Sequence, residues 1–220
     1  HNHPYVYGQA GLKGSKYCKK IMNSSDLVLS LGCRLAPQLV GLNFEAFDKA
    51  EIIMVDIDKA EIDKLGDSIN YSINSDVKLF LEEINNKSSD ISFPSWDNWI
   101  NYCDDLKRKN PMVVESQEKN PIDLYYFMKI LGELSHNRNV LVTDAGSNYY
   151  VGGTVWNFEK GQREICSGTN AAMGTTIPLA IGCAVAEPSF QILAVTGDGS
   201  LELNIQELKT ISHYSYNIKL

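Results

Sequence analysis

The residues best placed to do chemistry are Gly197-Asp198-Gly199-Ser200, which lie between the apolar run 191–196 (QILAVT) and a helical pattern. Glycines in a strand-to-helix turn let the backbone approach a ligand closely, and the free N–H groups at a helix start can hold a phosphate. Asp198 adds the hard oxygen ligand that Mg²⁺ takes together with phosphate oxygens. Asp-Gly is also common in hairpins, but here no second strand follows. These four residues therefore predict a site for a phosphorylated ligand and Mg²⁺.

Two further segments of the second half carry glycines and polar residues at the ends of expected elements. In residues 168–184 (GTNAAMGTTIPLAIGCA), Met173 stands ahead of a glycine and a proline, although a methionine by itself more often fills core space. In residues 143–148 (TDAGSN), Asp144 follows an apolar run and fits an ordinary turn residue equally well. Only their order with the Gly197 turn makes these segments informative.

That order resembles the thiamine-diphosphate-dependent enzymes, in particular their acetolactate synthase-like branch. Residues 197–211 (GDGSLELNIQELKTI) are similar to the family's diphosphate-binding segment, and the part 204–208 is more specific than Asp-Gly alone. Residues 168–184 resemble its GxxxxMGxxxPxAIGA segment. Residues 143–148 resemble its TDxGQH segment, with Ser-Asn in place of Gln-His. The Asn-Asn pair that ends the family's motif is expected just past Leu220.

The resemblance implies a set of cofactor contacts, with thiamine diphosphate and Mg²⁺ as the cofactors. Asp198 is the expected metal ligand, Met173 is expected to hold the cofactor bent, and the main chain near Ala171 is expected to bind its aminopyrimidine ring. The cofactor, when bound, supplies a nucleophilic carbon and an electron sink for decarboxylation. The expected cofactor-binding residues are Ala171, Met173, Gly197, Asp198, Gly199, Ser200, Gly146 and Ser147.

The activity that the resemblance implies is decarboxylation of a 2-oxo acid, with pyruvate as the expected substrate, and carboligation to a second carbonyl. The family's catalytic glutamate belongs to a preceding domain, and its active site spans the interface of a homo-oligomer. We therefore expect no catalytic residue in this chain and no activity from it alone. Two alternatives stay open: a sugar-linked or CoA-linked substrate for the same cofactor, and a non-catalytic nucleotide-binding module.

The first half resembles the central domain of the same enzymes. Four segments fall where acetolactate synthases contact FAD and where relatives bind ADP or nothing: residues 11–14 (GLKG), 32–34 (GCR), 56–57 (DI) and 76–77 (DV). The family's GxRFDDR becomes GCRLAPQ, which places Ala36 and Gln38 where an Asp and an Arg touch the flavin, and Lys13 replaces the His of GxHG. These departures argue against FAD and favour an empty Rossmann-like site.

Strand-like runs that alternate with helical patterns predict an α/β fold with parallel sheets. In the first half, strands are expected at 26–31, 51–56 and 68–73, followed by a helix with the stripe Val77, Phe80, Leu81 and Ile84. In the second half we expect a helix capped at Asn120-Pro121 that buries Leu124, Phe127, Leu131 and Leu134, strands at 139–143, 191–196 and 217–220, and helices at 175–186 and 202–213.

These elements predict two partial domains. Residues 1–90 read as the C-terminal part of the Rossmann-like central domain, residues 91–119 as a linker with one helix, and residues 120–220 as the N-terminal part of the α/β diphosphate-binding domain. Within the linker, Trp96, Trp99, Ile100 and Cys103 share one helical face. The chain is expected to be cut at both ends.

The composition supports a globular protein. The 220 residues are 44% hydrophobic and 21% charged, and the net charge of −7 argues against nucleic-acid and membrane-surface partners. No signal peptide is expected, because residues 1–20 are polar and lack an apolar stretch. No membrane span is expected either, because the long uncharged stretch 165–186 is rich in glycine, serine and threonine. The five scattered cysteines form no CxxC pair, which favours reduced thiols in a cytoplasm, with Cys33 and Cys183 as core fillers.

Overall fold

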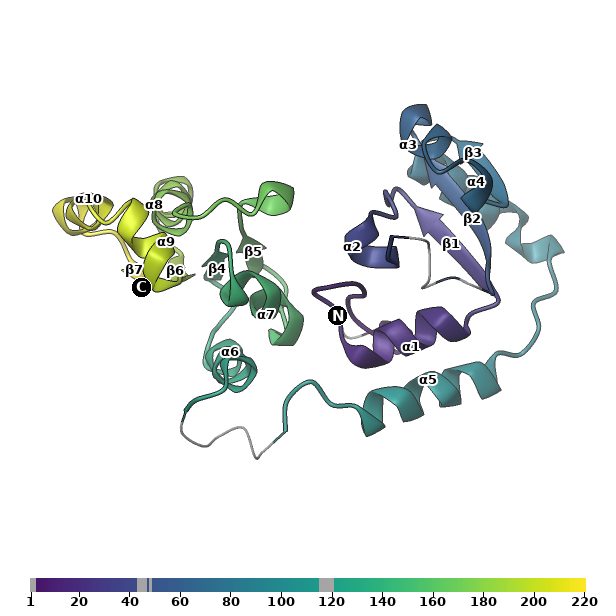
Figure 1. The fold of residues 1–220 in the computed structure, drawn as a ribbon, viewed down its shortest axis with the longest axis horizontal. Helices are drawn as coiled ribbons and strands as arrows, with labels where there is room; N and C mark the ends of the chain where they lie inside the picture. Colours follow the sequence, from purple (N-terminus) through teal and green to yellow (C-terminus); the bar gives the residue numbers. More distant parts are fainter. Residues whose placement is uncertain (1–2, 43–46, 48, 115–120) are drawn as a thin grey trace. The chain divides into compact units, whose positions relative to one another are not determined.

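The computed structural model describes residues 3–42, 47, 49–114 and 121–220, and it divides the chain into two compact units. One unit runs from Tyr7 to Asn110. The other contains the segment that starts at Pro111 and ends at Leu220, together with the N-terminal residues up to Val6. Each unit is built on a parallel sheet with helices packed on it (Figure 1).

The sheet of residues 7–110 has the order β1-β2-β3, with all strands parallel. The strands are β1 (Leu27–Leu31), β2 (Glu51–Asp56) and β3 (Tyr71–Asn74). The helices are α1 (Lys16–Ser24), α2 (Pro37–Val40), α3 (Lys59–Asp63), α4 (Val77–Lys87) and α5 (Asp97–Lys109), with 3₁₀ turns at Gly66–Ser68 and Ser88–Asp90. The core of this unit is formed by Leu35, Val40, Phe47 and Ile52, and Cys33 packs against it.

Helix α5 packs along α1 within this unit (Figure 1). Cys103 is buried, the Ser24 and Tyr102 hydroxyls are 3.0 Å apart, and Lys20 Nζ donates to Asn110 Oδ1 at 3.2 Å. The helix expected in a linker therefore belongs structurally with residues 7–110. The family-domain boundaries at residues 90 and 119 stay predictions.

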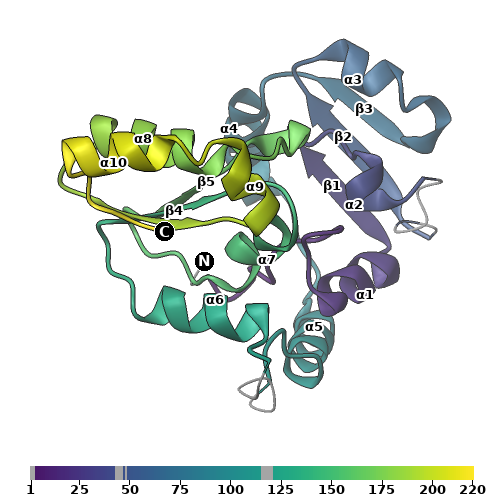
Figure 2. The ribbon, with the colours of Figure 1, turned by 60° about the vertical axis from the view of Figure 1, so that its left-hand side comes forward.

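The sheet of the second unit has the order β5-β4-β6-β7, again parallel. The strands are β4 (Asn139–Thr143), β5 (Arg163–Ile165), β6 (Gln191–Val195) and β7 (Ile218–Lys219). Helices α6 (Leu124–Glu133) and α7 (Ser147–Val155) cover one face, whereas α8 (Thr176–Ala186) and α10 (Glu207–Tyr214) lie on the other (Figure 2). The short helix α9 (Asp198–Leu203) follows β6, and a 3₁₀ turn spans Gly168–Asn170.

Each face of this second sheet has its own core. On one face Val140 and Val142 of β4 pack with Ala180 and Ala184 of α8, and Cys183 packs against this cluster. On the other face Leu141 packs with side chains from α6, α7 and the chain beyond α7: Met128, Val151 and Trp156. Because β4 is covered on both faces, all five of its residues are buried, as expected for a central parallel strand.

The structure confirms the expected α/β fold with parallel sheets, and it corrects helix α6. Asp123 caps this helix, because its Oδ1 accepts the N–H groups of Tyr125 and Tyr126 at 2.9 and 3.1 Å. Asn120, the expected cap, lies outside the described residues. The face that packs on the core carries Leu124, Met128 and Leu131, whereas Phe127 and Leu134 are exposed.

Three other expectations need correction. Strand β3 begins only at Tyr71, since a 3₁₀ turn occupies residues 66–68. The stripe on α4 is partly exposed, with Leu81 and Ile84 open to solvent. The single helix expected at 202–213 is two helices, α9 and α10, separated at Asn204. Among the described residues, no helix is both long and apolar enough to cross a membrane.

Candidate functional site

The carboxyl ends of β4 and β6 lie side by side at one edge of their sheet, where open α/β sheets bind ligands. We call the loops that follow them, residues 144–148 and 196–200, the β4–β6 edge. A cavity of about 410 Å³ opens there. It is lined by Leu124, Ala145, Gly146, Ser147, Asn148, Met173, Val195, Thr196, Gly197, Asp198, Gly199 and Ser200.

The expected Mg²⁺ ligand lies at the start of α9. Gly197, Asp198 and Gly199 are exposed, whereas Ser200 is buried. Asp198 carries the only carboxylate among the described residues that line the cavity. Its Oδ1 accepts the N–H of Gly199 at 2.9 Å, so this N–H group, expected to hold a phosphate, is engaged by the carboxylate.

A second helix begins at the same cavity. Gly146 caps α7 with φ +93°, a left-handed conformation that glycine adopts without strain. Ser147 is exposed at the first position of this helix. N–H groups in the first turn of a helix have no partner within the helix, and they favour anions. The structure thus brings Gly146 and Ser147 to the same cavity as residues 197–200.

Met173 lies in the cavity rather than in a core. Its side chain is 54% exposed, and its Cε would be 3.4 Å from a Cβ placed on Gly199. The end of the Met173 side chain therefore lies close to the turn that holds Asp198. Ala171, the other expected contact in this segment, is not among the lining residues. It has φ +43° and ψ +44°, a left-handed conformation that costs a residue with a Cβ about 1–2 kcal/mol.

Two asparagines brace the loops around the cavity, a role that the sequence alone did not predict, since it left Asn148 and Ser147 as possible contacts to the diphosphate. The buried Asn148 amide donates to Asp144 Oδ1 at 3.2 Å and to the Val195 carbonyl at 2.6 Å, which ties the ends of β4 and β6 together. Asp144 is fully buried, and its Oδ2 also accepts from Thr196 Oγ1 at 3.4 Å. Asp144 therefore does not act as a simple turn residue, because its carboxylate accepts hydrogen bonds from Asn148 and Thr196. The NH₂ group of Asn148 is engaged in hydrogen bonds within the protein.

Asn204 forms the second brace, because its Nδ2 donates to the Gly174 carbonyl at 2.7 Å. It belongs to the run 204–208, which carried the most specific family resemblance. Its place in this run was the feature of the sequence that pointed to Asn204. For Asn148 the signal was weaker, since the resemblance placed it in a segment near the diphosphate without separating a ligand contact from a brace.

The donor set fits a magnesium diphosphate. One exposed carboxylate, two helix starts and exposed glycine backbone meet at one cavity. A Cβ on Gly197 would meet no atom within 4 Å, so the backbone there is open to a close ligand approach. Mg²⁺ binds through one or two carboxylates together with phosphate oxygens and water, which this edge can accommodate with Asp198 alone.

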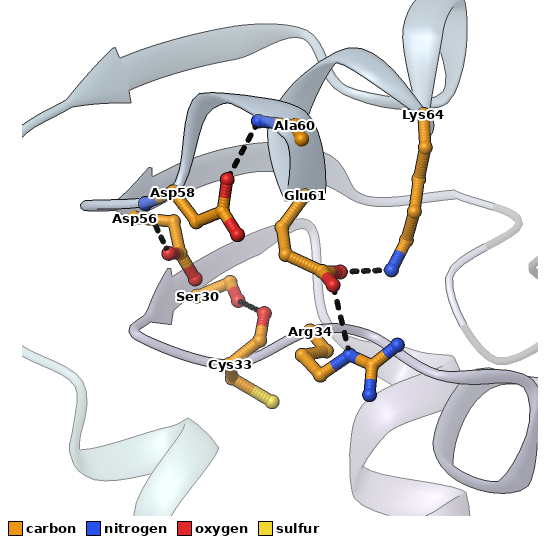
Figure 3. Close-up of polar contacts among 8 residues, drawn as sticks. All are labelled: Ser30, Cys33, Arg34, Asp56, Asp58, Ala60, Glu61 and Lys64. Carbon is orange, nitrogen blue, oxygen red and sulfur yellow. Dashed lines mark hydrogen bonds and ion pairs between the residues drawn. The ribbon is translucent and has the colours of Figure 1, made fainter.

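The corresponding edge of the first sheet is arranged differently (Figure 3). We call residues 30–34 and 56–64, at the ends of β1 and β2, the β1–β2 edge. Arg34 Nε lies 3.1 Å from Glu61 Oε1, and Glu61 also pairs with Lys64. In the same region Asp56 Oδ1 accepts the N–H of Asp58 at 2.9 Å. The side chains of Arg34, Glu61 and Asp56 therefore have ion-pair or hydrogen-bond partners within this edge.

One segment expected near a flavin, residues 11–14, and the segment 37–41 line a second cavity, of about 350 Å³. The N–H of Leu12 donates to the Gln38 carbonyl at 2.9 Å, and a Cβ on Gly11 would lie 2.6 Å from that same oxygen. The segment 11–14 and the segment around Gln38 are thus in contact. The Asp and Arg that touch the flavin in the family are replaced by Ala36 and Gln38, and Arg34 is engaged by Glu61. These differences argue against FAD.

Comparisons with known proteins bear on both units. Residues 1–84 match the thiamine pyrophosphate enzyme central domain, and residues 144–220 match the C-terminal TPP binding domain of the same enzymes. A probable acetolactate synthase large subunit from Methanococcus aeolicus is 30% identical over 97% of this chain and 38% of its own length. The chloroplastic acetolactate synthase of Arabidopsis thaliana is 32% identical over 96% of the chain and 32% of its own length.

The chain therefore spans about a third of the length of the curated relatives that it matches. The match over residues 144–220 contains the segments 168–184 and 197–211 and confirms the resemblance drawn from them, and the match over residues 1–84 confirms the resemblance of the first half. By its two domain matches and its relatives, the chain belongs to the thiamine-diphosphate-dependent enzymes of the acetolactate synthase type.

Proposed function

We propose that this chain forms the diphosphate-binding part of an enzyme that decarboxylates a 2-oxo acid, pyruvate first among them, and joins the remaining fragment to a second carbonyl. The observation that carries this proposal is the meeting of Asp198, the α7 start and Met173 at one cavity. The relatives' printed name, acetolactate synthase, supports the choice of reaction.

In this proposal the residues of the chain bind and orient the cofactor. Asp198 would hold Mg²⁺ and, through it, the diphosphate, and Gly146, Ser147, Gly199 and Ser200 would offer backbone N–H groups to phosphate oxygens. Met173 would present an apolar surface in the same cavity and exclude water from it. No side chain of this chain is assigned the acid–base role, which we expect from a glutamate of another domain.

We also propose that the enzyme is a homo-oligomer with its active site at the dimer interface, that its metal is Mg²⁺, and that it works without FAD. A cytoplasmic location is proposed as well. It is supported by the five cysteines, which are scattered along the sequence and are all free thiols in the structure.

The test is isothermal titration of the full-length protein with thiamine diphosphate in the presence and absence of Mg²⁺. We expect Mg²⁺-dependent binding that weakens at least about 100-fold in Asp198→Ala, since the metal loses its carboxylate. Asp105→Ala, on the exposed face of α5, is the control and leaves binding unchanged. The bound protein is then assayed for pyruvate consumption and for the carboligation product. Absence of Mg²⁺-dependent binding in the full-length protein contradicts the proposal.

A further inference from the structure

Asn204 joins the two halves of the cavity through its side chain. It is the residue that ends α9, and its Nδ2 donates to the carbonyl of Gly174 at 2.7 Å, across 30 positions of sequence. Gln206 Nε2 donates to Asn204 Oδ1 at 3.3 Å. Because the oxygen of the amide accepts from Gln206, its NH₂ group faces Gly174.

The two segments joined in this way carry the two kinds of expected contact. Gly174 directly follows Met173. At the other end of α9, about 9 Å away along a six-residue helix, lies Asp198. The Asn204 bond therefore connects the Met173 turn with the helix whose first turn would hold the diphosphate.

The packing around this bond leaves the Met173 turn little freedom. Gly174 has φ +77°, and a Cβ there would lie 2.8 Å from Leu203 Cβ and 3.0 Å from Asn204 Nδ2. The backbone of the turn thus lies directly on the end of α9. At the start of α9, Met173 Cε would be 3.4 Å from a Cβ on Gly199, so the Met173 side chain also lies close to the first turn of the helix.

We propose that Asn204 is a positioning residue, which sets the distance between Met173 and the diphosphate-binding turn before the cofactor arrives. This proposal rests on the function proposed above. A ligand that spans both segments benefits from such pre-organisation, because its binding then spends no free energy on ordering the turn. A ligand that occupies only the diphosphate half does not depend on it.

The test compares two ligands on the full-length protein with Mg²⁺: thiamine diphosphate, which spans both segments, and inorganic pyrophosphate, which occupies one. In Asn204→Ala we expect thiamine diphosphate to bind about tenfold more weakly, the factor that corresponds to one lost hydrogen bond. Pyrophosphate affinity should stay within about twofold of wild type, since Asp198 and its turn are intact. Asn204→Ser, whose hydroxyl is too short to reach Gly174, gives the same result and serves if the alanine variant does not fold.

The matched control is Asn139→Ala. Asn139 is also a bracing amide, with Oδ1 accepting the His136 N–H at 2.6 Å and Nδ2 donating to Gln191 Oε1 at 3.1 Å, but it lies at the opposite end of β4. Its loss lowers the melting temperature and leaves both affinities unchanged. Equal weakening of both ligands by Asn204→Ala, or no weakening, overturns the role of Asn204. Wild-type protein that binds neither ligand overturns the proposed function as well.

Discussion

At the β4–β6 edge Gly197, Asp198 and Gly199 are exposed, whereas at the β1–β2 edge Arg34 and Glu61 pair with one another. Both edges follow the carboxyl ends of parallel strands, and both carry glycine turns. At the first edge the polar side chains that are buried, Asn148 among them, hold backbone in place and leave the cavity open. At the second edge the charged side chains pair with one another: Glu61 pairs with Arg34 and with Lys64.

This difference shows that the same kind of sheet edge can either bind a ligand or only stabilise the fold. An edge that binds a ligand must keep polar groups available and must obtain its rigidity from elsewhere, here from the Asn148 and Asn204 amides. An edge whose polar groups are paired keeps the fold without such a ligand. The comparison predicts that substitutions at the two edges act on different observables, cofactor affinity at one and stability alone at the other.

Gly174→Ala should have the largest effect. The substitution places a Cβ 2.8 Å from Leu203 Cβ in a residue with φ +77°, so the backbone strain and the clash add. We expect a loss of about 2–4 kcal/mol in unfolding free energy. Thermal unfolding followed by circular dichroism measures it as a fall of about 5–10 °C. Gly197→Ala is the control, because its Cβ meets no atom within 4 Å. Equal losses in both variants contradict the packing role.

Leu35→Gly should have the next largest effect, directly after the first segment of the β1–β2 edge. Leu35 has φ +47°, yet it is only 4% exposed and belongs to the core of its unit. Removing the side chain costs about 2–5 kcal/mol, and relief of the backbone returns about 1–2 kcal/mol. The net loss in stability is measured by thermal unfolding, with Leu35→Met as the volume-conserving control. A stabilised glycine variant would show that packing at this turn is unimportant.

Ala171→Gly should act in the opposite direction. Ala171 shares the left-handed conformation of Leu35, with φ +43°, but it is not a core residue. Relief of the strain exceeds the extra entropy of glycine in the unfolded chain, so the melting temperature rises by an amount that corresponds to about 0.5–1 kcal/mol. The matched variant Ala172→Gly, outside this conformation, lowers it. A fall in both variants means that residue 171 bears no strain.

The sequence predicted much of this comparison through local patterns. The glycine turns, the strand β6 ahead of residues 197–200 and the family membership all follow from short segments whose meaning needs no distant partner. The exposed Phe127 and the break at Asn204 were not predicted, because each depends on what packs against the element rather than on its own spacing. The Asn148 and Asn204 braces were missed for the same reason, since each amide bonds to backbone 47 or 30 positions away.

Glu61→Gln should have the smallest effect, and it tests whether the ion pair closes the β1–β2 edge. The Arg34 side chain is 61% exposed, so the pair is screened by solvent and its loss changes stability by less than about 0.5 kcal/mol. Arg34→Gln is the matched variant from the other side of the pair. If Ala36 and Gln38 are what excludes FAD, the wild type and both variants stay without visible flavin absorbance after incubation with it. Flavin uptake by Glu61→Gln alone would instead assign the exclusion to the ion pairs of Glu61, because the variant releases Arg34 and Lys64 from that carboxylate.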